Sequence, residues 1–155
     1  AKSYYKTASL IANSAKSVGV LSGLSEESSE QLYSYGRDLG LAFQIVDDIL
    51  DFTSSDDVLG KPAGSDLKSG NLTAPVLYAI EEEPYLVTLI EREFSQEGDF
   101  EQALHLIQIS QGIERSRELA SEHAHNAVER LENLEESDSK QALREISNYV
   151  LRRLY

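Results

Sequence analysis

The residues best suited to chemistry lie close together between residues 40 and 52. Four polar side chains interrupt this otherwise apolar stretch: Gln44, Asp47, Asp48 and Asp51. Their spacing of i, i+3, i+4 and i+7 is helical, so they form one stripe on a helix whose other sides are apolar. Such a helix is expected to be buried, and three carboxylates on one side of it repel one another where water is excluded. The stripe therefore requires a positive charge that neutralises it.

The charge that suits these side chains best is a hard cation. Mg²⁺ prefers oxygen ligands and is usually held by few protein groups together with waters and phosphate oxygens, so we infer Mg²⁺ that bridges to a diphosphate. The alternative is a solvated acidic face at the end of a surface helix. A calcium-binding EF-hand loop fits poorly, because the residues after Asp51 lack its alternating ligands and its closing Glu.

Basic and polar residues flank the acidic stripe in the sequence. Lys61 and Lys68 follow it among three glycines, where the backbone can approach a ligand closely, so their ammonium groups are candidates to close over phosphate oxygens. A second polar stripe precedes it, with Thr7 beside one of its members: Lys2, Lys6, Ser9 and Asn13. Taken alone, this second stripe is typical of a solvated helix face.

The elements that must position these residues are all helical. Apolar residues recur at helical spacing over residues 2–21, and Ser25 predicts the N-cap of a second, long helix that ends before Ser54. Residues 54–71 are long and irregular, which favours a functional loop. Further helix starts are indicated at Thr73 with Pro75, at Pro84, at Gly98, after Gly112 and at about Ser137. No strand alternation is evident, so we predict an all-α helical bundle, one domain over residues 1–155.

The composition excludes several classes of function. Hydrophobic residues make up 41% of the 155 residues, which is enough for a buried core, and the absence of cysteine excludes disulfides and thiolate chemistry. A formal net charge of −13 argues against a nucleic-acid or anionic membrane surface. No apolar run approaches the roughly 18 residues that a membrane span needs. An anionic substrate would need a cation to mediate its binding.

The ordered set of motifs resembles the trans-isoprenyl diphosphate synthases. It consists of Lys6-Thr7, Phe43-Gln44 leading into Asp47-Asp48-Ile-Leu-Asp51, Gly60-Lys61, Gly-Ser-Asp66-Leu and Gly70-Asn-Leu-Thr-Ala-Pro75, in this order. Each motif alone is weak, but the set covers most of the first 80 residues and is highly specific. The resemblance implies the C-terminal half of an all-α bundle of the isoprenoid synthase type.

The resemblance also implies a Mg²⁺-dependent prenyltransferase that condenses isopentenyl diphosphate with an allylic diphosphate. In that family Mg²⁺ ions between two aspartate-rich motifs hold the allylic diphosphate, which leaves as pyrophosphate. The double bond of isopentenyl diphosphate attacks the allylic cation, and a proton is lost. By resemblance, the Mg²⁺ ligands of the second motif are Asp47, Asp48 and Asp51, the allylic diphosphate is bound by Lys6 and Lys61, the cation is lined by Thr7 and Gln44, and Phe43 belongs to the substrate site.

Two departures from the family pattern matter. Asn71 stands where many short-chain relatives have Lys, which is similar to long-chain enzymes of cyanobacteria and plastids and implies solanesyl-type products, precursors of quinone side chains. The first aspartate-rich motif is absent and the chain begins at Ala1, so we expect upstream material and do not expect full activity from this chain alone. By resemblance, Arg152 and Arg153 occupy a region where some relatives close a basic tail over isopentenyl diphosphate. A helix-end charge effect explains them equally well, so they are left out of the site.

Two other functions are weighed against the elongating enzyme. One is a non-catalytic partner subunit of a heteromeric synthase, which the intact second motif disfavours. The other is a terpene cyclase of the same fold, which would consume an allylic diphosphate alone. Like its family, the protein is expected to be a homodimer, located in the cytoplasm or the plastid stroma and possibly peripheral to a membrane.

Overall fold

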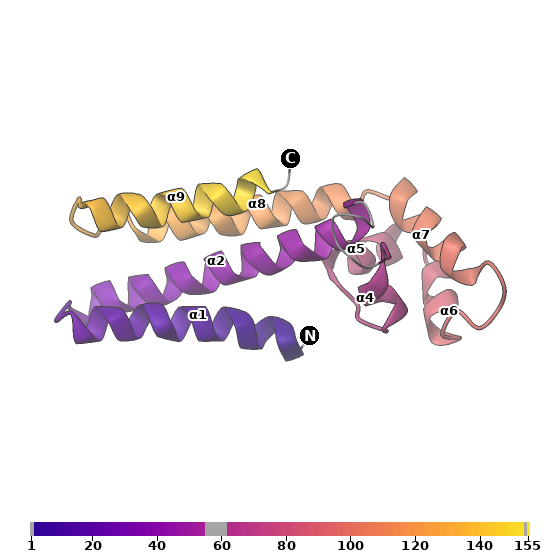
Figure 1. The fold of residues 1–155 in the computed structure, drawn as a ribbon, viewed down its shortest axis with the longest axis horizontal. Coiled ribbons are helices and arrows are strands. Elements are labelled where there is room, and N and C mark those ends of the chain that lie inside the picture. Colours follow the sequence, from indigo (N-terminus) through magenta and orange to yellow (C-terminus); the bar gives the residue numbers. More distant parts are fainter. Residues whose placement is uncertain (1, 55–61, 154) are drawn as a thin grey trace. The chain divides into compact units, whose positions relative to one another are not determined.

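The computed structural model describes residues 2–54, 62–153 and 155, with side chains from residue 6 onward. These residues form helices and turns without a strand among them, which confirms the all-α prediction (Figure 1). The helices are α1 (Lys2–Leu21), α2 (Glu26–Thr53), α4 (Ser65–Lys68), α5 (Ala74–Glu82), α6 (Tyr85–Glu91), α7 (Asp99–Ile109), α8 (Gly112–Arg130) and α9 (Asp138–Arg152). None of the helices in these described ranges is long and apolar enough to cross a membrane.

The helix ends follow the local sequence signals. The Ser28 N–H donates to Ser25 Oγ at 3.1 Å, so Ser25 caps α2 as predicted, and Ser137 caps α9 in the same way. Pro75 lies in the first turn of α5, where its missing N–H costs no hydrogen bond. One difference is the single turn α4, which interrupts the segment predicted to be irregular. Residues 55–61 of that segment lie outside the described residues.

The chain divides into two compact units. The first comprises residues 47–118, which are the end of α2, the helices α4 to α7 and the start of α8. The second comprises Lys2–Val46 and Leu119–Tyr155, which are α1, most of α2, the rest of α8 and α9. That residues 1–155 are the C-terminal part of an isoprenoid synthase domain stays a prediction.

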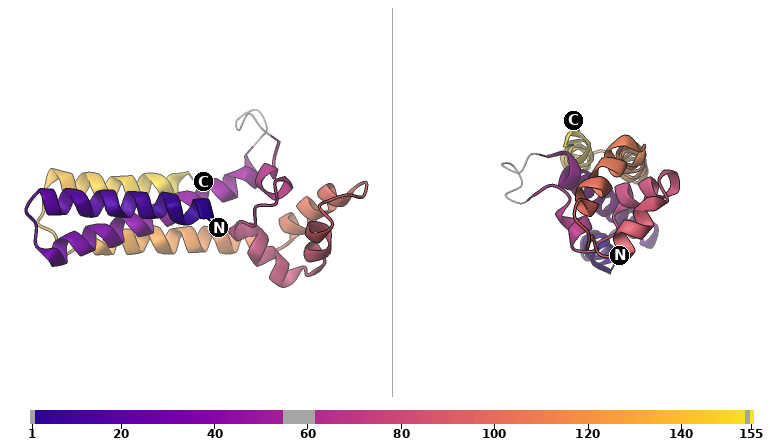
Figure 2. Two further views of the ribbon diagram at one scale, coloured as in Figure 1. Left: turned by 90° about the horizontal axis from the view of Figure 1, so that it is seen from below. Right: turned by 90° about the vertical axis from the view of Figure 1, so that its right-hand side faces the viewer.

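In the second unit, α1 and α2 form an antiparallel pair joined by a short turn, as do α8 and α9 (Figures 1 and 2). Its interior is filled mainly by alanine and aliphatic side chains together with one tyrosine: Ala8, Ala12, Leu32, Tyr35, Ala127, Leu131 and Val150. The Tyr35 hydroxyl donates to the carbonyl oxygen of Leu143 at 2.9 Å, which satisfies the polar end of a buried ring. This bond ties α9 to α2.

Two glycines let α1 approach α2 closely. A Cβ built on Gly40 would lie 2.8 Å from the Ala8 Cα, and one built on Gly36 would lie 2.8 Å from the Ala12 Cα. Real Cβ atoms essentially never come this close to another atom, so no larger residue fits at either position. The backbones of α1 and α2 can therefore approach each other closely there. The glycines that interrupt the pattern of α2 are therefore packing residues rather than helix breaks.

A buried carboxylate connects α2 to α8 in the same unit. The side chain of Asp38 is 4% exposed, and its Oδ1 lies 3.0 Å from His123 Nδ1. Arg37 and Arg130 approach the other oxygen at 3.6 and 3.9 Å. Positive and hydrogen-bonding groups thus surround a charge that would otherwise be costly to bury.

The first unit has its own core, around which α4 to α8 are arranged. Its buried members are Phe52, Leu67, Val76, Ala79, Leu86, Leu89, Ala103 and Ile107. The turn between α6 and α7 is closed by an ion pair in which Arg92 Nε donates to Asp99 Oδ2 at 2.7 Å. The hydrogen bond from Arg92 holds the pKa of the Asp99 carboxyl below its usual range.

Candidate active site

The acidic stripe lies near the C-terminal end of α2. The helix continues to Thr53, so Asp47, Asp48 and Asp51 keep the predicted helical spacing. Asp48 and Asp51 are buried, at 5% and 2% exposure, and Asp47 is half-buried. A solvated acidic face therefore does not describe Asp48 and Asp51. Their burial is costly unless other groups stabilise the charge. The stripe is a buried feature, as the apolar flanks indicated.

Asp51 also organises the chain that returns after residues 55–61. Its Oδ1 accepts a hydrogen bond from Ser65 Oγ and its Oδ2 accepts one from the Asp66 N–H, both at 3.2 Å. The Gly64 N–H donates to the Asp51 carbonyl oxygen at 2.8 Å. Gly64 itself has φ 75°, a left-handed conformation that glycine adopts without strain. Asp51 thus binds the start of α4, a role that its position in the motif did not indicate.

The donor chemistry of the stripe fits a hard cation, but the stripe does not form a complete metal site. Asp47 and Asp48 are adjacent carboxylates, which are suitable ligands for Mg²⁺. Across residues 2–54, 62–153 and 155, no three acidic or histidine side chains are gathered so that they could hold an ion between them. A cation here would therefore need further oxygens from phosphate and water, which is the usual arrangement for Mg²⁺.

The other predicted residues on α1 and α2 belong to the second unit. Lys6 is exposed and Thr7 is half-buried on α1, while Phe43 and Gln44 are half-buried on α2. Because α1 and α2 are antiparallel and meet at Ala8 and Gly40, Thr7 and Phe43 each lie within one turn of this contact. The backbone contact therefore sets where the predicted substrate residues of one helix lie relative to those of the other.

The remaining lysines and the polar stripe of α1 are less informative. Lys61 lies outside the described residues, and Lys68 is exposed with its Nζ 5.5 Å from the centroid of the Phe100 ring. On α1, Asn13 Nδ2 donates to the Ser9 carbonyl oxygen at 2.8 Å on an exposed face. Bonds within one exposed face are typical of a solvated surface, which is the alternative interpretation of this stripe.

Arg153 lies beside a predicted substrate residue, a contact that no local pattern indicated. Its guanidinium carbon is 5.2 Å from the centroid of the Phe43 ring, which is cation–π geometry. The two residues are 110 positions apart, so no local spacing could have revealed their proximity. The helix-end interpretation of Arg153 omitted this long-range partner.

Comparisons with known proteins decide the family. The sequence profile described as polyprenyl synthetase matches residues 1–107. The chain belongs to the polyprenyl synthetase family. It is similar to a prenyl transferase of Synechocystis sp., with 61% identity over 154 residues, and to solanesyl-diphosphate synthase 2, chloroplastic, of Oryza sativa subsp. japonica, with 50% identity over 153 residues. The predicted resemblance is confirmed.

A solved structure of the polyprenyl synthetase type confirms the fold. A polyprenyl synthase from Caulobacter crescentus, solved in complex with calcium and isoprenyl diphosphate, matches with a TM-score of 0.85 and 34% identity over 98% of this chain and 48% of that one. The matches to the Synechocystis and rice relatives each include 99% of this chain, but only 48% and 38% of the relatives' lengths. It therefore spans less than half the length of each of these three proteins.

Replacement of Asp51 by alanine tests its structural role within this polyprenyl synthetase fold. In the presence of EDTA we expect Asp51→Ala to lower the free energy of unfolding by about 2 kcal/mol, because two donors lose their acceptor in a buried place. Urea unfolding followed by circular dichroism measures this. Ser65→Ala, which removes one of the two donors, should cost less. If Asp51 served only as a metal ligand, its removal in EDTA would relieve repulsion and leave stability equal or higher.

Proposed function

We propose that the protein is a Mg²⁺-dependent prenyltransferase that condenses isopentenyl diphosphate with an allylic diphosphate to build a long-chain polyprenyl diphosphate. The observation that carries this proposal is the stripe of half-buried Asp47 and buried Asp48 and Asp51, in a chain with 50% identity to a solanesyl-diphosphate synthase. Carboxylates at this spacing on one side of a helix repel one another, and a bound cation would neutralise that repulsion. A partner subunit without catalytic function would gain nothing from keeping carboxylates that repel one another.

Asp47 and Asp48 are the residues that would hold Mg²⁺, with Asp51 beside them. When bound, the metal supplies positive charge that stabilises the oxygens of the departing pyrophosphate. The Caulobacter synthase was solved with both calcium and isoprenyl diphosphate, which supports a divalent cation together with such a substrate. Asp51 has a second task, because its hydrogen bonds to Ser65 and Asp66 hold the returning chain at the end of the stripe.

The remaining site residues are proposed to bind the substrate and to stabilise the charges that form during the reaction. The Lys6 ammonium group, exposed on α1, binds the allylic diphosphate, and Lys61 is proposed to do the same. As the allylic C–O bond breaks, its electron pair leaves with pyrophosphate, and the oxygens of Thr7 and Gln44 stabilise the carbocation. The π electrons of isopentenyl diphosphate then form the new C–C bond, and loss of a proton restores a double bond. The Phe43 ring provides an apolar wall to the substrate.

Product length, location and assembly are inferred from the relatives. The name of the rice relative and Asn71 in the Gly70-Asn-Leu-Thr motif support long-chain, solanesyl-type products destined for quinone side chains. The chloroplastic name supports the plastid stroma as the location, and the Synechocystis relative supports the cytoplasm. We also propose a homodimer, the usual state of symmetric soluble enzymes.

The test is a prenyl transfer assay on the protein expressed from the whole gene and, in parallel, on this 155-residue chain. Labelled isopentenyl diphosphate is supplied with farnesyl or geranylgeranyl diphosphate and Mg²⁺, and products are resolved by chain length. We expect long polyprenyl products from the whole-gene protein, none in EDTA, and none from the allylic substrate alone. Consumption of the allylic diphosphate without isopentenyl diphosphate would instead indicate a cyclase, and inactivity of the whole-gene protein would contradict the proposal.

A further inference from the structure

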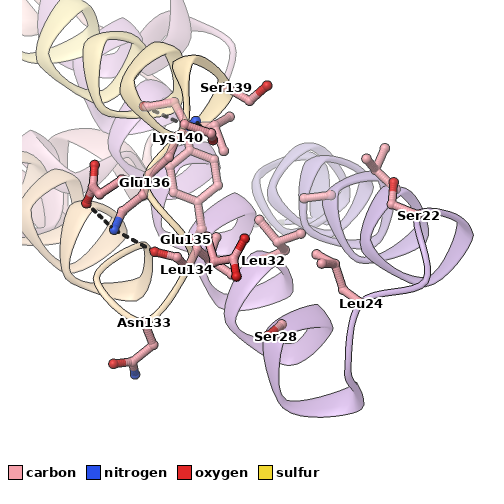
Figure 3. Close-up of a pocket in the computed structure, with 15 residues that line it drawn as sticks. Ser22, Leu24, Ser28, Leu32, Asn133, Leu134, Glu135, Glu136, Ser139 and Lys140 are labelled. Carbon is pink, nitrogen blue, oxygen red and sulfur yellow. Dashed lines mark hydrogen bonds and ion pairs between the residues drawn. The ribbon is translucent and has the colours of Figure 1, made fainter.

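An open groove lies at the end of the second unit where the α1–α2 turn faces the α8–α9 turn (Figure 3). Its volume is about 650 Å³, and every residue that lines it belongs to the second unit. Most of the lining surface is apolar, although serine, glutamate and lysine residues also line the groove. The larger apolar residues come from both turns and from α1, α2 and α9: Val18, Leu24, Leu32, Tyr35, Leu134 and Leu143. The groove contains none of the predicted active-site residues.

The groove is a surface feature rather than a gap in the core. Leu32 and Tyr35 form a buried floor, at 8% and 3% exposure, whereas Val18 and Leu24 on its wall are 61% and 43% exposed. The hydroxyl of Tyr35 is already bonded to the Leu143 carbonyl oxygen, so the ring presents carbon to the groove. Exposed apolar side chains around a concave surface are a common feature of binding sites on soluble proteins.

The α8–α9 turn that forms one wall is held rigidly. Lys140 is 3% exposed, and its Nζ donates to the Leu134 carbonyl oxygen at 2.8 Å and to Glu136 Oε1 at 2.6 Å (Figure 3). Ser137 caps α9 in the same turn by accepting from the Lys140 N–H at 3.0 Å. A wall that is ordered before binding does not lose conformational entropy when a ligand arrives.

The two turns that flank the groove carry excess negative charge. Their acidic residues are Glu26, Glu27 and Glu30 at the start of α2, and Glu132, Glu135, Glu136 and Asp138 around the α8–α9 turn. The nearby cations are already engaged: Lys16 pairs with Glu30, Lys140 with Glu136, and Arg144 with Glu132 and Glu136. Among the described residues, Glu27, Glu135 and Asp138 have no ion pair, so their charge is available to a partner.

From this combination we propose that the groove binds a basic amphipathic helix of another protein. An apolar helix face fits an apolar groove, and Lys or Arg beside that face would meet the unpaired acids on its flanks. A second copy that paired groove to groove fits less well, because the acidic turns of both copies would then face each other. Anionic lipid headgroups are disfavoured for the same reason. The proposal is independent of the catalytic function.

The test uses two synthetic helical peptides with the same leucines at i, i+3, i+4 and i+7 and either lysine or glutamate elsewhere. Fluorescence anisotropy with labelled peptide measures binding to the 155-residue chain. We expect the lysine peptide to bind, the glutamate peptide not to bind, and added NaCl to weaken the complex. The double variant Val18→Ser, Leu24→Ser should weaken binding about tenfold or more, since both side chains wall the groove.

Matched control variants distinguish binding in this groove from nonspecific binding of the peptide elsewhere on the protein. Leu10→Ser removes an apolar side chain of α1 that is 69% exposed but does not line the groove, and Glu122→Gln removes an exposed acid of α8 away from it. Neither should change the affinity, whereas Glu135→Gln should reduce it several-fold. Equal loss in the controls, equal binding of both peptides, or no binding at all would overturn the proposal.

Two further outcomes would assign the groove to another occupant and so overturn the proposal. If the whole-gene protein fails to bind the lysine peptide that the 155-residue chain binds, the groove is covered by the protein's own chain. If light scattering shows that the chain forms a dimer that the Val18→Ser, Leu24→Ser variant cannot form, the occupant is a second copy. Peptide binding by the whole-gene protein with the same response to the variants supports the proposal.

Discussion

Replacement of Asp47 or Asp48 by asparagine in the whole-gene protein is expected to lower kcat/KM for prenyl transfer by about a thousandfold, or roughly 4 kcal/mol of transition-state stabilisation. Asparagine keeps the shape of the side chain and removes the charge that a cation needs. Because the whole departing pyrophosphate depends on that cation, the loss is expected in kcat as well as in KM. The assay is steady-state incorporation of labelled isopentenyl diphosphate.

The stability of the same variants distinguishes a functional carboxylate from a structural one. The readout is the change in thermal midpoint that the ligand causes, measured for each variant against its own midpoint in EDTA. Mg²⁺ with pyrophosphate should raise the midpoint of the wild-type protein, because a ligand that binds only the folded state stabilises it. Asp47→Asn should lose this gain. Asp138→Asn, an exposed acid in the first turn of α9, should keep both the gain and the activity.

Gly40→Ala and Gly36→Ala are each expected to destabilise the second unit by about 2 kcal/mol. Glycine to alanine inside a helix normally stabilises by roughly 0.5–1 kcal/mol, so the sign itself is informative. The reason is that the new Cβ would lie 2.8 Å from backbone atoms of α1, which cannot turn aside as a side chain can. Urea unfolding followed by circular dichroism gives the two free energies.

The contact of Gly40 with Ala8 also predicts a functional consequence. If α1 is pushed away from α2, Thr7 and Phe43 separate, and prenyl transfer should fall even below the unfolding temperature. Gly23→Ala is the control in the same unit, because nothing lies within 4 Å of its Cβ and only its φ of 75° is unfavourable. Its cost is limited to about 1–2 kcal/mol, with no loss of activity in the folded protein. A stabilising Gly40→Ala would contradict the close packing.

The helices could be predicted because their signals are local. Ser25 caps α2 through the N–H three residues later, and Ser137 does the same for α9, so the sequence alone contains both partners of each bond. The acidic stripe is local too, since Asp47, Asp48 and Asp51 share one side of any helix with this sequence. That is why the stripe, and the cation chemistry expected of it, followed from spacing.

The roles of particular residues depended on partners that are far away in the chain. Gly40 interrupts a helix pattern in the sequence, but in the fold it is the place where Ala8 of α1 meets the backbone. In the sequence Asp51 is one acid of a motif, whereas in the structure its carboxylate accepts hydrogen bonds from Ser65 and Asp66. In the sequence Arg153 is a charge at a helix end, whereas in the structure its guanidinium lies over the Phe43 ring. None of these pairs has a characteristic spacing.

The sequence by itself therefore determined the helical fold class, the longer helices, the family and the acidic stripe. Each of these depends on residues within a few turns of one another or on the order of short motifs. The tertiary structure alone decided that α1 and α2 meet at glycines, that Asp51 holds the start of α4, and that an apolar groove opens between two acidic turns. Those features arise from packing between segments far apart in the chain, where many pairings suit the same local pattern and only the assembled core selects one.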